Sequence, residues 1–416
     1  MRRAVAPLRP LPLPACFALL IGAAALVLAA PVLRAAPPAE VRALWVTRVS
    51  LSSDASIASL VQSARASGFN TLLVQVRGRG DAYYASTIDP RGEILQNQRQ
   101  DFDPLAAVIE KAHAEGLRVH AWINVSLVAS AAELPSARTH VIYRHPEWLM
   151  LPRPLTYPLT RLGSRSPEFL GRLARWTRGE NDVEGMFLSS ALPEAATYTV
   201  QVVDEIVSRY AVDGVHLDYI RYPGPQFDYN PSVLRRFLED LSPALSDAER
   251  RRVDPLSVAD LIGVTDRYPQ RWEEFRRSRL NALVLRIRTV VKNRRPESVL
   301  SAAVFPDAAE AASRRFQDWR LWVENRWIDV LCPMAYTPEA AVFAAQISSA
   351  RTLAGLQPVW AGIGAYRLSP AQTVENIEAA RRLGARGVIL FSYDSLVRPP
   401  RGAEVLASIG RAAFAP

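Results

Sequence analysis

The sequence predicts a (β/α)8 barrel, an α/β fold in which eight parallel strands alternate with helices. Short apolar, β-branched runs alternate with longer segments of helical spacing from residue 41 to the end of the chain. Such alternation is typical of βαβ units and a parallel sheet. Eight repeats of this kind favour a closed barrel over an open sheet.

The strands are predicted where β-branched residues gather between turn residues. They are Val41–Arg48, Thr71–Arg77, Leu117–Val125, Gly214–Ile220, Val299–Phe305, Ile328–Met334, Pro358–Ile363 and Gly387–Ser392. The helices are predicted at Ser56–Ala66, Pro104–Glu115, Glu194–Tyr210, Trp272–Lys292, Ala309–Glu324, Glu339–Leu353, Pro370–Arg382 and Ala403–Ala413. Gly68, Gly116, Gly355 and Gly384 stand where helices should end.

Two connections are long. Leu127 to Leu192 joins the third strand to its helix, and Pro223 to Pro269 follows the fourth strand. Loops that follow the strands build the active-site face of such barrels. We therefore expect both insertions at that face, and the first has room for a small subdomain.

The first residues read as a signal for export. Arg2, Arg3 and Arg9 precede the uncharged apolar run Phe17–Val32, and small residues follow. This pattern predicts a signal peptide at residues 1–36, cleaved near residue 35 or 36, and a barrel domain at 37–416. The alternative is an uncleaved N-terminal anchor. An exported, periplasmic or extracellular protein without stable membrane insertion is expected, because no later apolar stretch reaches about 20 residues.

The charge and the cysteine content limit the partners and the disulfide bonds that can be expected. The formal net charge is +9, but the arginines are scattered, with no basic stripe that alternates with aromatics. Nucleic acid is therefore not an expected partner, whereas attraction to an anionic cell-wall polymer is compatible with the charge. Cys332 is the one cysteine beyond the predicted signal, so no internal disulfide is expected.

Polar residues occupy one face of several predicted strands near their carboxyl ends. They are Gln75 and Arg77; His120, Trp122 and Asn124; His216 and Asp218; and Ser392 and Asp394. The opposite faces are apolar and would meet the helices, so these polar side chains should point into the barrel. A buried polar group without a partner costs about 1–3 kcal/mol. The cluster therefore predicts a binding site, with a satisfied interior hydrogen-bond network as the alternative.

Asp218, at the end of the fourth strand, is the first candidate for a catalytic carboxylate. Arg221 nearby should favour its ionised form, which can act as a nucleophile or base. Aromatic residues at the same rim, with the strand polar groups, suit sugar rings and their hydroxyls. The predicted substrate-binding residues are Gln75, Arg77, His120, Trp122, Asn124, His216, Tyr219, Arg221, Tyr222, Tyr336, Tyr366 and Tyr393. Trp45 and Trp360 are equally compatible with core packing.

Glycoside hydrolysis normally needs a second carboxyl group. The candidates, in order, are Asp81 after the second strand, Asp394 after the eighth and Asp307 after the fifth. Each is equally compatible with an aspartate that caps a turn or helix.

A series of motifs in one order resembles the family-10 glycosyl-hydrolase-like proteins. It includes Arg42–Val46, Phe69–Arg77, Gly80–Tyr84, Phe102–Leu105, Gly116–Asn124, His145–Trp148, Asp213–Tyr219, Arg221–Pro223 and Phe391–Asp394. The resemblance spans Val41 to about Ala412. It implies an exported TIM-barrel glycoside hydrolase, with Asp218 as the key acid and, in some relatives, action on peptidoglycan glycan strands. Relatives usually carry an Asp-Pro segment before the third helix, whereas Phe187–Pro193 here contains no acid.

We therefore expect an exported hydrolase of a cell-wall glycan (peptidoglycan) or exopolysaccharide that uses no cofactor. A non-catalytic carbohydrate-binding barrel is one alternative. A metal-dependent hydrolase built on His120, His216, Asp218 and Asp394 is another. It is disfavoured because the five histidines include no closely spaced chelating pair.

Overall fold

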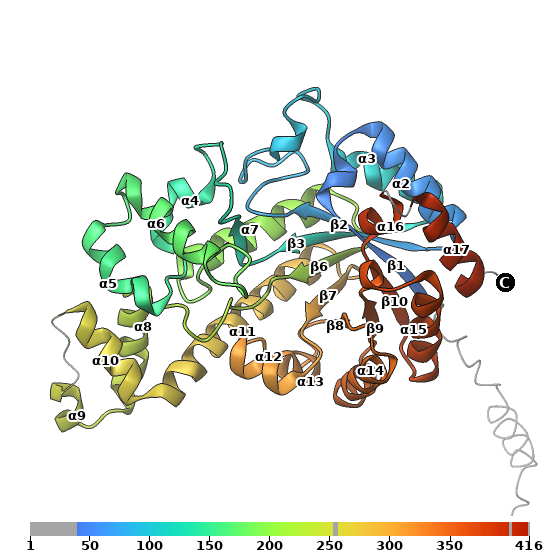
Figure 1. Ribbon diagram of the computed structural model, residues 1–416. Coiled ribbons are helices and arrows are strands. Elements are labelled where there is room, and N and C mark those ends of the chain that lie inside the picture. The colour runs from blue at the N-terminus through green and yellow to red at the C-terminus, as the bar shows by residue number, and fades with distance from the viewer. Residues whose placement is uncertain (1–39, 253–256, 399–401, 415–416) are drawn as a thin grey trace, which may run out of the picture. The chain divides into compact units, whose positions relative to one another are not determined.

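The computed structural model describes residues 40–252, 257–398 and 402–414. The predicted signal peptide lies outside these residues and stays a prediction. Within them, the chain forms a closed barrel of parallel strands surrounded by helices (Figure 1). Among the described residues, no helix is both long and apolar enough to cross a bilayer.

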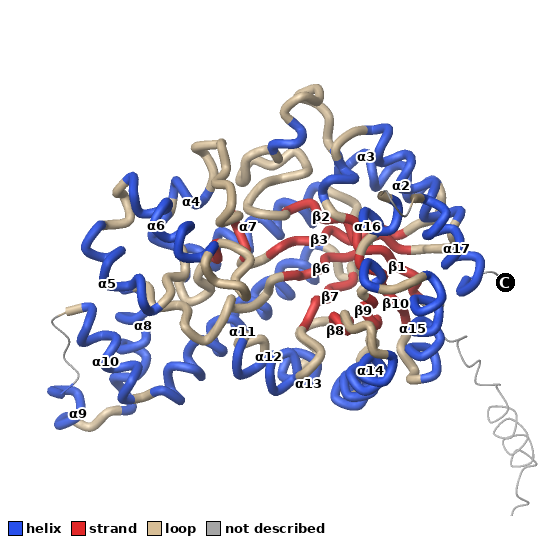
Figure 2. The backbone as a smooth tube through the Cα atoms, viewed as in Figure 1, coloured by secondary structure: helices blue, strands red, loops and turns tan. Residues whose placement is uncertain are grey.

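The predicted (β/α)8 barrel is confirmed. All eight predicted strands are present, in the closed order β1-β10-β9-β8-β7-β6-β3-β2. Their bounds are β1 (Val41–Val46), β2 (Thr71–Arg77), β3 (Arg118–Asn124), β6 (Gly214–Asp218), β7 (Val299–Val304), β8 (Val330–Ala335), β9 (Trp360–Ile363) and β10 (Gly387–Phe391). Figure 2 shows the strands gathered at the centre of the helices.

The outer layer also follows the prediction, with one break. The helices that cover the barrel are α2 (Asp54–Ala66), α3 (Pro104–Ala114), α7 (Pro193–Arg209), α11 (Pro269–Arg294), α12 (Ala308–Arg314), α13 (Trp319–Glu324), α14 (Ala340–Ala354), α15 (Pro370–Arg382) and α17 (Ala403–Phe414). The single helix predicted at Ala309–Glu324 is wrong, because it is two helices. Between them, Phe316 adopts a φ of 53° and buries its ring completely.

The alternation of side chains along the strands separates two cores. Trp45, Leu73, Trp122 and Ile389 belong to a cluster inside the barrel. Their strand neighbours, such as Leu72, belong to a larger cluster between strands and helices. The period of two therefore identified the inward faces of β2, β3 and β6 correctly. It was wrong for the eighth strand, because β10 ends at Phe391, Ile389 is its inward residue, and Ser392 and Asp394 begin the helix α16 (Tyr393–Val397).

Both long insertions are folded. The first holds β4 (Leu127–Ala129), α4 (Val141–Arg144), α5 (Arg153–Leu162), α6 (Pro167–Arg178) and β5 (Met186–Phe187), and the second holds α8 (Pro231–Leu241), α9 (Asp247–Arg252) and α10 (Val258–Arg267). The insertions contact each other: the guanidinium of Arg153 pairs with Asp266 at 2.6 Å. In Figure 1 both insertions extend to the left of strands β3 and β6. Short helices at Tyr393–Val397 (α16) and 3-10 turns at Arg48–Leu51 (η1) and Ala365–Arg367 (η5) complete the rim.

Candidate active site

A cavity of about 390 Å³ opens at the carboxyl end of the barrel, and Asp218 lies in its wall. Its lining residues are Trp45, Trp122, Glu184, Asp218, Tyr219, Arg221, Ala303, Phe305, Met334, Tyr336, Tyr366, Arg367 and Phe391. They come from several strands and from the first insertion, which is how barrels build active sites. Six of the predicted site residues meet here: Asp218, Trp122, Tyr219, Arg221, Tyr336 and Tyr366.

The backbone after β6 holds the Asp218 carboxylate in place. Asp218 pairs in register with Asn124 of β3. The next residue, Tyr219, has a φ of 48°, and its N–H donates to Oδ1 of Asp218 at 2.6 Å. A non-glycine residue in this left-handed region costs free energy, and such residues gather at functional sites. The turn therefore stores local strain directly beside the candidate acid.

The cavity changes the acidity of Asp218. Burial raises the pKa of its carboxyl to about 6, although the Tyr219 N–H and the Arg221 charge act in the opposite direction. The negative charge of Glu184 raises the pKa further. Arg221 thus acts in the predicted direction, but desolvation outweighs its attraction, so the pKa of Asp218 lies above the ordinary aspartate value and not below it.

Glu184, which the sequence analysis missed, is the second carboxylate of the cavity. Its Oε1 lies 2.5 Å from Nη2 of Arg221. Gly185 follows it, and a side chain there would collide with the carbonyl oxygen of Ala129 in β4. This close approach lets the β4–β5 ribbon carry Glu184 to the cavity. The only signal in the sequence is the Glu-Gly pair just ahead of the segment where relatives carry an acid.

Arg221 is held between the rings of three aromatic residues. Its guanidinium carbon lies 4.7 Å from the ring centre of Tyr219, 5.3 Å from that of Phe305 and 5.7 Å from that of Phe187. Arginine over aromatic faces is stabilised by the ring quadrupole. The position of Arg221, and with it that of Glu184, is therefore restricted by packing from the first insertion, the turn after β6 and the end of β7.

Aromatic rings form the floor of the cavity. The Trp45 ring meets those of Tyr336 and Phe391 at 6.1 Å and 6.0 Å, edge to face. Below them, Nε1 of Trp45 donates to Nε2 of His216 at 2.9 Å, and Nδ1 of His216 lies 2.9 Å from Oγ of Ser301. Burial lowers the pKa of His216 to about 3, so the imidazole is neutral. His216 therefore supports the floor from beneath and does not line the cavity.

Other predicted binding residues form a polar layer behind the wall. Nε1 of Trp122 donates to Oδ1 of Asn124 at 3.0 Å, and Nδ2 of Asn124 donates to the Gly78 carbonyl at 2.6 Å. Gln75 donates to Asn124 at 3.4 Å. His120 is fully buried, and burial lowers its pKa to about 4. Gln75 and Asn124 therefore belong to an interior hydrogen-bond network, the alternative given above, and do not line the cavity.

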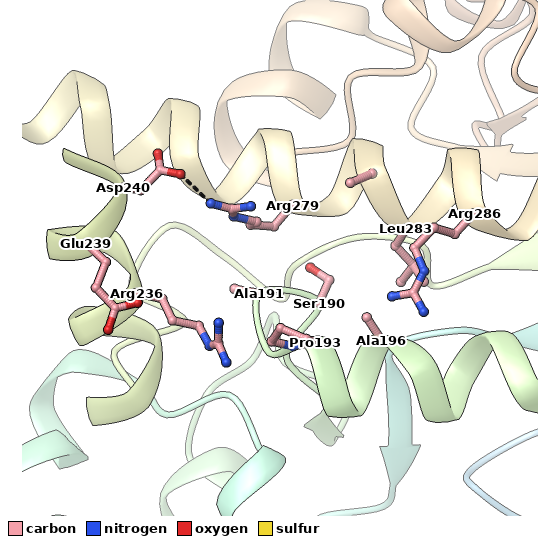
Figure 3. A pocket seen from close by; sticks show the side chains of 11 residues that line it. Ser190, Ala191, Pro193, Ala196, Arg236, Glu239, Asp240, Arg279, Leu283 and Arg286 are labelled. Carbon is pink, nitrogen blue, oxygen red and sulfur yellow. Dashed lines mark hydrogen bonds and ion pairs between the residues drawn. The ribbon is translucent and has the colours of Figure 1, made fainter. Parts of the chain in front are cut away.

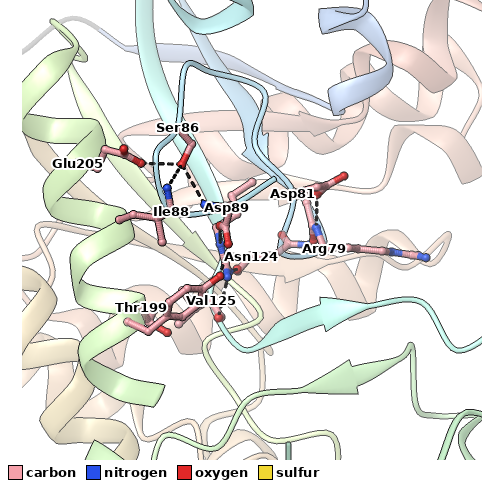
Figure 4. A network of polar contacts seen from close by, with 12 residues as sticks. Arg79, Asp81, Ser86, Ile88, Asp89, Asn124, Val125, Thr199 and Glu205 are labelled. Carbon is pink, nitrogen blue, oxygen red and sulfur yellow. Dashed lines mark hydrogen bonds and ion pairs between the residues drawn. The ribbon is translucent and has the colours of Figure 1, made fainter. Parts of the chain in front are cut away.

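Arg77 is bound to other protein groups. Its Nε lies 2.7 Å from Oδ2 of Asp89, and both side chains are completely buried. Tyr198 donates its hydroxyl to the other Asp89 oxygen, and Figure 4 shows Asp89 and Asn124 at the centre of this network. The β2–β3 register shifts between Gln75 and Arg77. This irregularity explains why Arg77 does not share the cavity with Asp218.

Two more predicted residues pack at the rim without lining the cavity. The ring of Tyr222 is fully buried against Phe316, with ring centres 5.1 Å apart. Tyr393 is buried at the start of α16. Of the two tryptophans left open, Trp45 lines the cavity and Trp360 is buried against His120, with ring centres 5.6 Å apart.

The three aspartates predicted as second carboxylates lie elsewhere. Asp394 is buried and accepts hydrogen bonds from the Thr47 N–H and the Ser50 hydroxyl, both at 2.7 Å. Asp307 is exposed and caps α12 by accepting from the Glu310 N–H at 2.7 Å. Asp81 lines a neighbouring cavity of about 410 Å³.

Among the described residues, no three His, Cys, Asp or Glu side chains come together as a metal-ion site. A cavity between α7, α8 and α11 contains Arg236, Arg279 and Arg286 (Figure 3). Each of the three contacts its own partner, namely Glu194, Asp240 or Thr197.

Relatives with curated descriptions share this sequence at modest identity. The glycosyl hydrolase YngK of Bacillus subtilis is 24% identical over 334 residues, which are 71% of this chain and 54% of that protein. The glycosyl hydrolase DigH of Escherichia coli K12 is 25% identical over 317 residues, which are 70% of this chain and 62% of DigH. The matched part therefore spans less than two thirds of each relative.

Solved structures share the fold. The glycoside hydrolase domain of PgaB (BpsB) from Bordetella bronchiseptica superposes with a TM-score of 0.61 at 14% identity, over 89% of this chain and 99% of that one. The catalytic domain of a β-amylase from Paenibacillus polymyxa gives 0.59 at 10% identity, over 90% and 97%. The family described as glycosyl hydrolase-like 10 matches residues 40–364, and the chain therefore belongs to this family.

Proposed function

We propose that this protein is an exported glycoside hydrolase that cleaves glycosidic bonds in a bacterial cell-wall glycan, such as peptidoglycan, or in an exopolysaccharide. The family and the fold support glycoside hydrolysis as the reaction class. The predicted export signal favours a glycan outside the cytoplasm as substrate, and the basic charge of the chain is compatible with an anionic one. Asp218 and Glu184 are the proposed catalytic pair.

One observation carries the proposal: two carboxyl groups in one aromatic-walled cavity have different environments. Burial and the Glu184 charge raise the pKa of Asp218, which favours its protonated form. Glu184 instead forms an ion pair with Arg221. Pairs of carboxyl groups in unlike surroundings are the usual arrangement of an acid and its partner in glycosidases.

These environments assign the roles. Asp218 donates its proton to the glycosidic oxygen as the bond to the sugar carbon breaks. Glu184 is the carboxylate that attacks that carbon or activates the water that does so. The rings of Tyr336, Tyr366 and Phe391 offer apolar faces against which a sugar ring can pack. The Arg221 ion pair keeps the Glu184 carboxylate in position.

The test is incubation of the purified protein, without residues 1–36, with peptidoglycan stripped of its peptides and with a panel of neutral and acidic polysaccharides. New reducing ends from at least one glycan are expected. Binding of a glycan without new reducing ends would instead support a carbohydrate-binding barrel. Fractionation of the cells that express the full chain tests export, and retention in the cytoplasm would contradict it.

A further inference from the structure

The cavity that contains Asp81 lies beside the catalytic cavity and has no role in the proposed reaction. It measures about 410 Å³ and is formed by the loops that follow β1, β2 and β3. Arg48 and Arg79 line it, and the half-exposed side chains of Val49 and Ile94 form part of its rim. Its volume falls within the roughly 300–1,000 Å³ of small-molecule sites.

Positive charge is incompletely neutralised at one side of this cavity. The guanidinium of Arg79 makes no hydrogen bond or ion pair with any residue that the structure describes. In Figure 4 it extends away from the Asp89–Asn124 network. Arg48 lies 3.9 Å from Asp81, whose other oxygen already accepts the Arg79 backbone N–H at 2.7 Å. Two guanidinium groups thus share one carboxylate.

The two arginines repel each other. Burial and the charge of Arg48 lower the pKa of Arg79 below its usual value. Glu93 and Glu133 line the same cavity, but among the described residues neither forms an ion pair with Arg48 or Arg79. Glu93 is bound instead to the hydroxyl and N–H of Ser136. An anion between Arg48 and Arg79 would relieve their repulsion.

The polar layer behind Trp122 connects this cavity to the catalytic one. Nη1 of Arg48 donates to Gln75 at 3.0 Å, and Gln75 donates to Asn124, which accepts from Trp122 in the catalytic wall. The charge of Arg79 also acts on the hydroxyl of Tyr219, which lines the catalytic cavity. The two cavities are therefore neighbours at the same end of the barrel.

We propose that this neighbouring cavity is a second sugar subsite, which takes a carboxylate-bearing residue of the glycan and binds its carboxylate through Arg48 and Arg79. The inference rests on the proposed function, because it assumes that a glycan occupies the catalytic cavity. It adds to the proposed function a second cavity and two arginines that recognise the carboxylate of the glycan, which the catalytic pair does not supply. Bidentate pairing makes arginine well suited to a carboxylate.

The test compares two matched oligosaccharides by calorimetric titration. One is a glycan-strand fragment that alternates N-acetylglucosamine and N-acetylmuramic acid, and the other is the same fragment with its lactyl carboxyl groups amidated. All titrations use the Asp218→Asn variant, which prevents turnover. The acidic fragment is expected to bind at least about tenfold more tightly, the factor that one charge-assisted contact supplies.

Arg79→Gln should remove this preference and leave the affinity for the amidated fragment unchanged. Arg118→Gln, an equal charge loss at the opposite end of β3 where the side chain is exposed, should change neither affinity. Equal binding of both fragments before mutation, or an equal loss for both in Arg79→Gln, would overturn the subsite. Selective binding by a protein that cleaves no glycan would instead refute the hydrolase and leave the subsite standing.

Discussion

The Oε1 atom of Glu184 lies 2.5 Å from Nη2 of Arg221, and this ion pair stands in the wall of the cavity that contains Asp218. The arginine thereby positions one carboxylate while its charge also acts on the other. A loop from the first insertion and the turn after β6 meet in this contact. The assignment of Glu184 as the second catalytic carboxylate depends on this ion pair.

Glu184→Gln should lower kcat at least about a hundredfold, because it removes the carboxylate that attacks or activates water. Gln keeps the size of the side chain, so the folded structure should persist by circular dichroism. Asp182→Asn, an exposed acid in the same loop, is the matched control and should leave kcat within about twofold. Near-normal turnover in Glu184→Gln would exclude Glu184 as the second carboxyl.

The rate should fall as the pH rises through about 6. Asp218 acts in its protonated form, and its pKa is raised to about 6, so the active fraction decreases above that pH. His120 and His216 do not account for this limb, because burial lowers their pKa values to about 4 and about 3. The measurement is kcat/KM between pH 4.5 and 8.

The residual activity of Glu184→Gln tests whether Asp218 is the group whose ionisation lowers the rate above pH 6. The Glu184 charge contributes to the raised pKa of Asp218, so its removal should move the limb to lower pH. A rate that instead increases through pH 6 in the unmodified protein would mean that Asp218 acts as a base or nucleophile.

Asp218→Asn should stabilise the protein at neutral pH. The folded-state pKa of about 6 exceeds the ordinary aspartate value, so the folded protein holds a proton that the unfolded chain releases as the pH rises from 4 to 6. Ionisation therefore costs the folded state stability above pH 6. After allowance for the solvent that reaches this partly exposed side chain, we expect a gain of about 1–2 kcal/mol.

Urea unfolding at pH 7.5 and pH 4.5 measures whether Asp218→Asn raises or lowers the free energy of unfolding. The gain should be largest at pH 7.5 and clearly smaller at pH 4.5, where the folded carboxyl is largely protonated but the unfolded one, with its ordinary pKa of 3.8, is mostly ionised. A loss of stability at pH 7.5 would show that the carboxylate is stabilised by its surroundings.

Arg77→Met should destabilise the fold by about 3–5 kcal/mol, because it leaves the Asp89 carboxylate buried and unpaired. The double variant Arg77→Met, Asp89→Asn should recover part of that loss, since it removes the buried charge. Glycan affinity of the folded Arg77→Met protein should be unchanged. A stable variant with weakened glycan binding would restore Arg77 as a substrate-binding residue.

The fold could be predicted because it depends on local patterns. Thr71–Arg77 was predicted to the residue, since its β-branched and apolar side chains repeat with the period of a strand and end in turn residues. The same period placed Trp122 and Asp218 on the inward face. The break at Phe316 was not visible, because nothing in the composition of Ala309–Glu324 signals a left-handed residue.

The residues that line the catalytic cavity could be predicted only in part. A shared inward face does not tell which side chains reach solvent: His216 lies deeper on β6 than Asp218 and is occupied by Trp45 and Ser301. The β2–β3 irregularity, which depends on a neighbouring strand, moved Arg77 away from the cavity. Glu184 escaped prediction because its place depends on β4 and β5, a ribbon formed within an insertion without a clear pattern.

The most direct test of the proposed chemistry is Asp218→Asn, assayed on one glycan for both turnover and binding. We expect kcat to fall at least about a hundredfold, while the dissociation constant of the glycan changes by no more than about threefold. Asp307→Asn, which changes an exposed aspartate that caps α12, is the control and should keep most of the catalytic rate. Undiminished release of reducing ends by Asp218→Asn would exclude Asp218 as the catalytic acid.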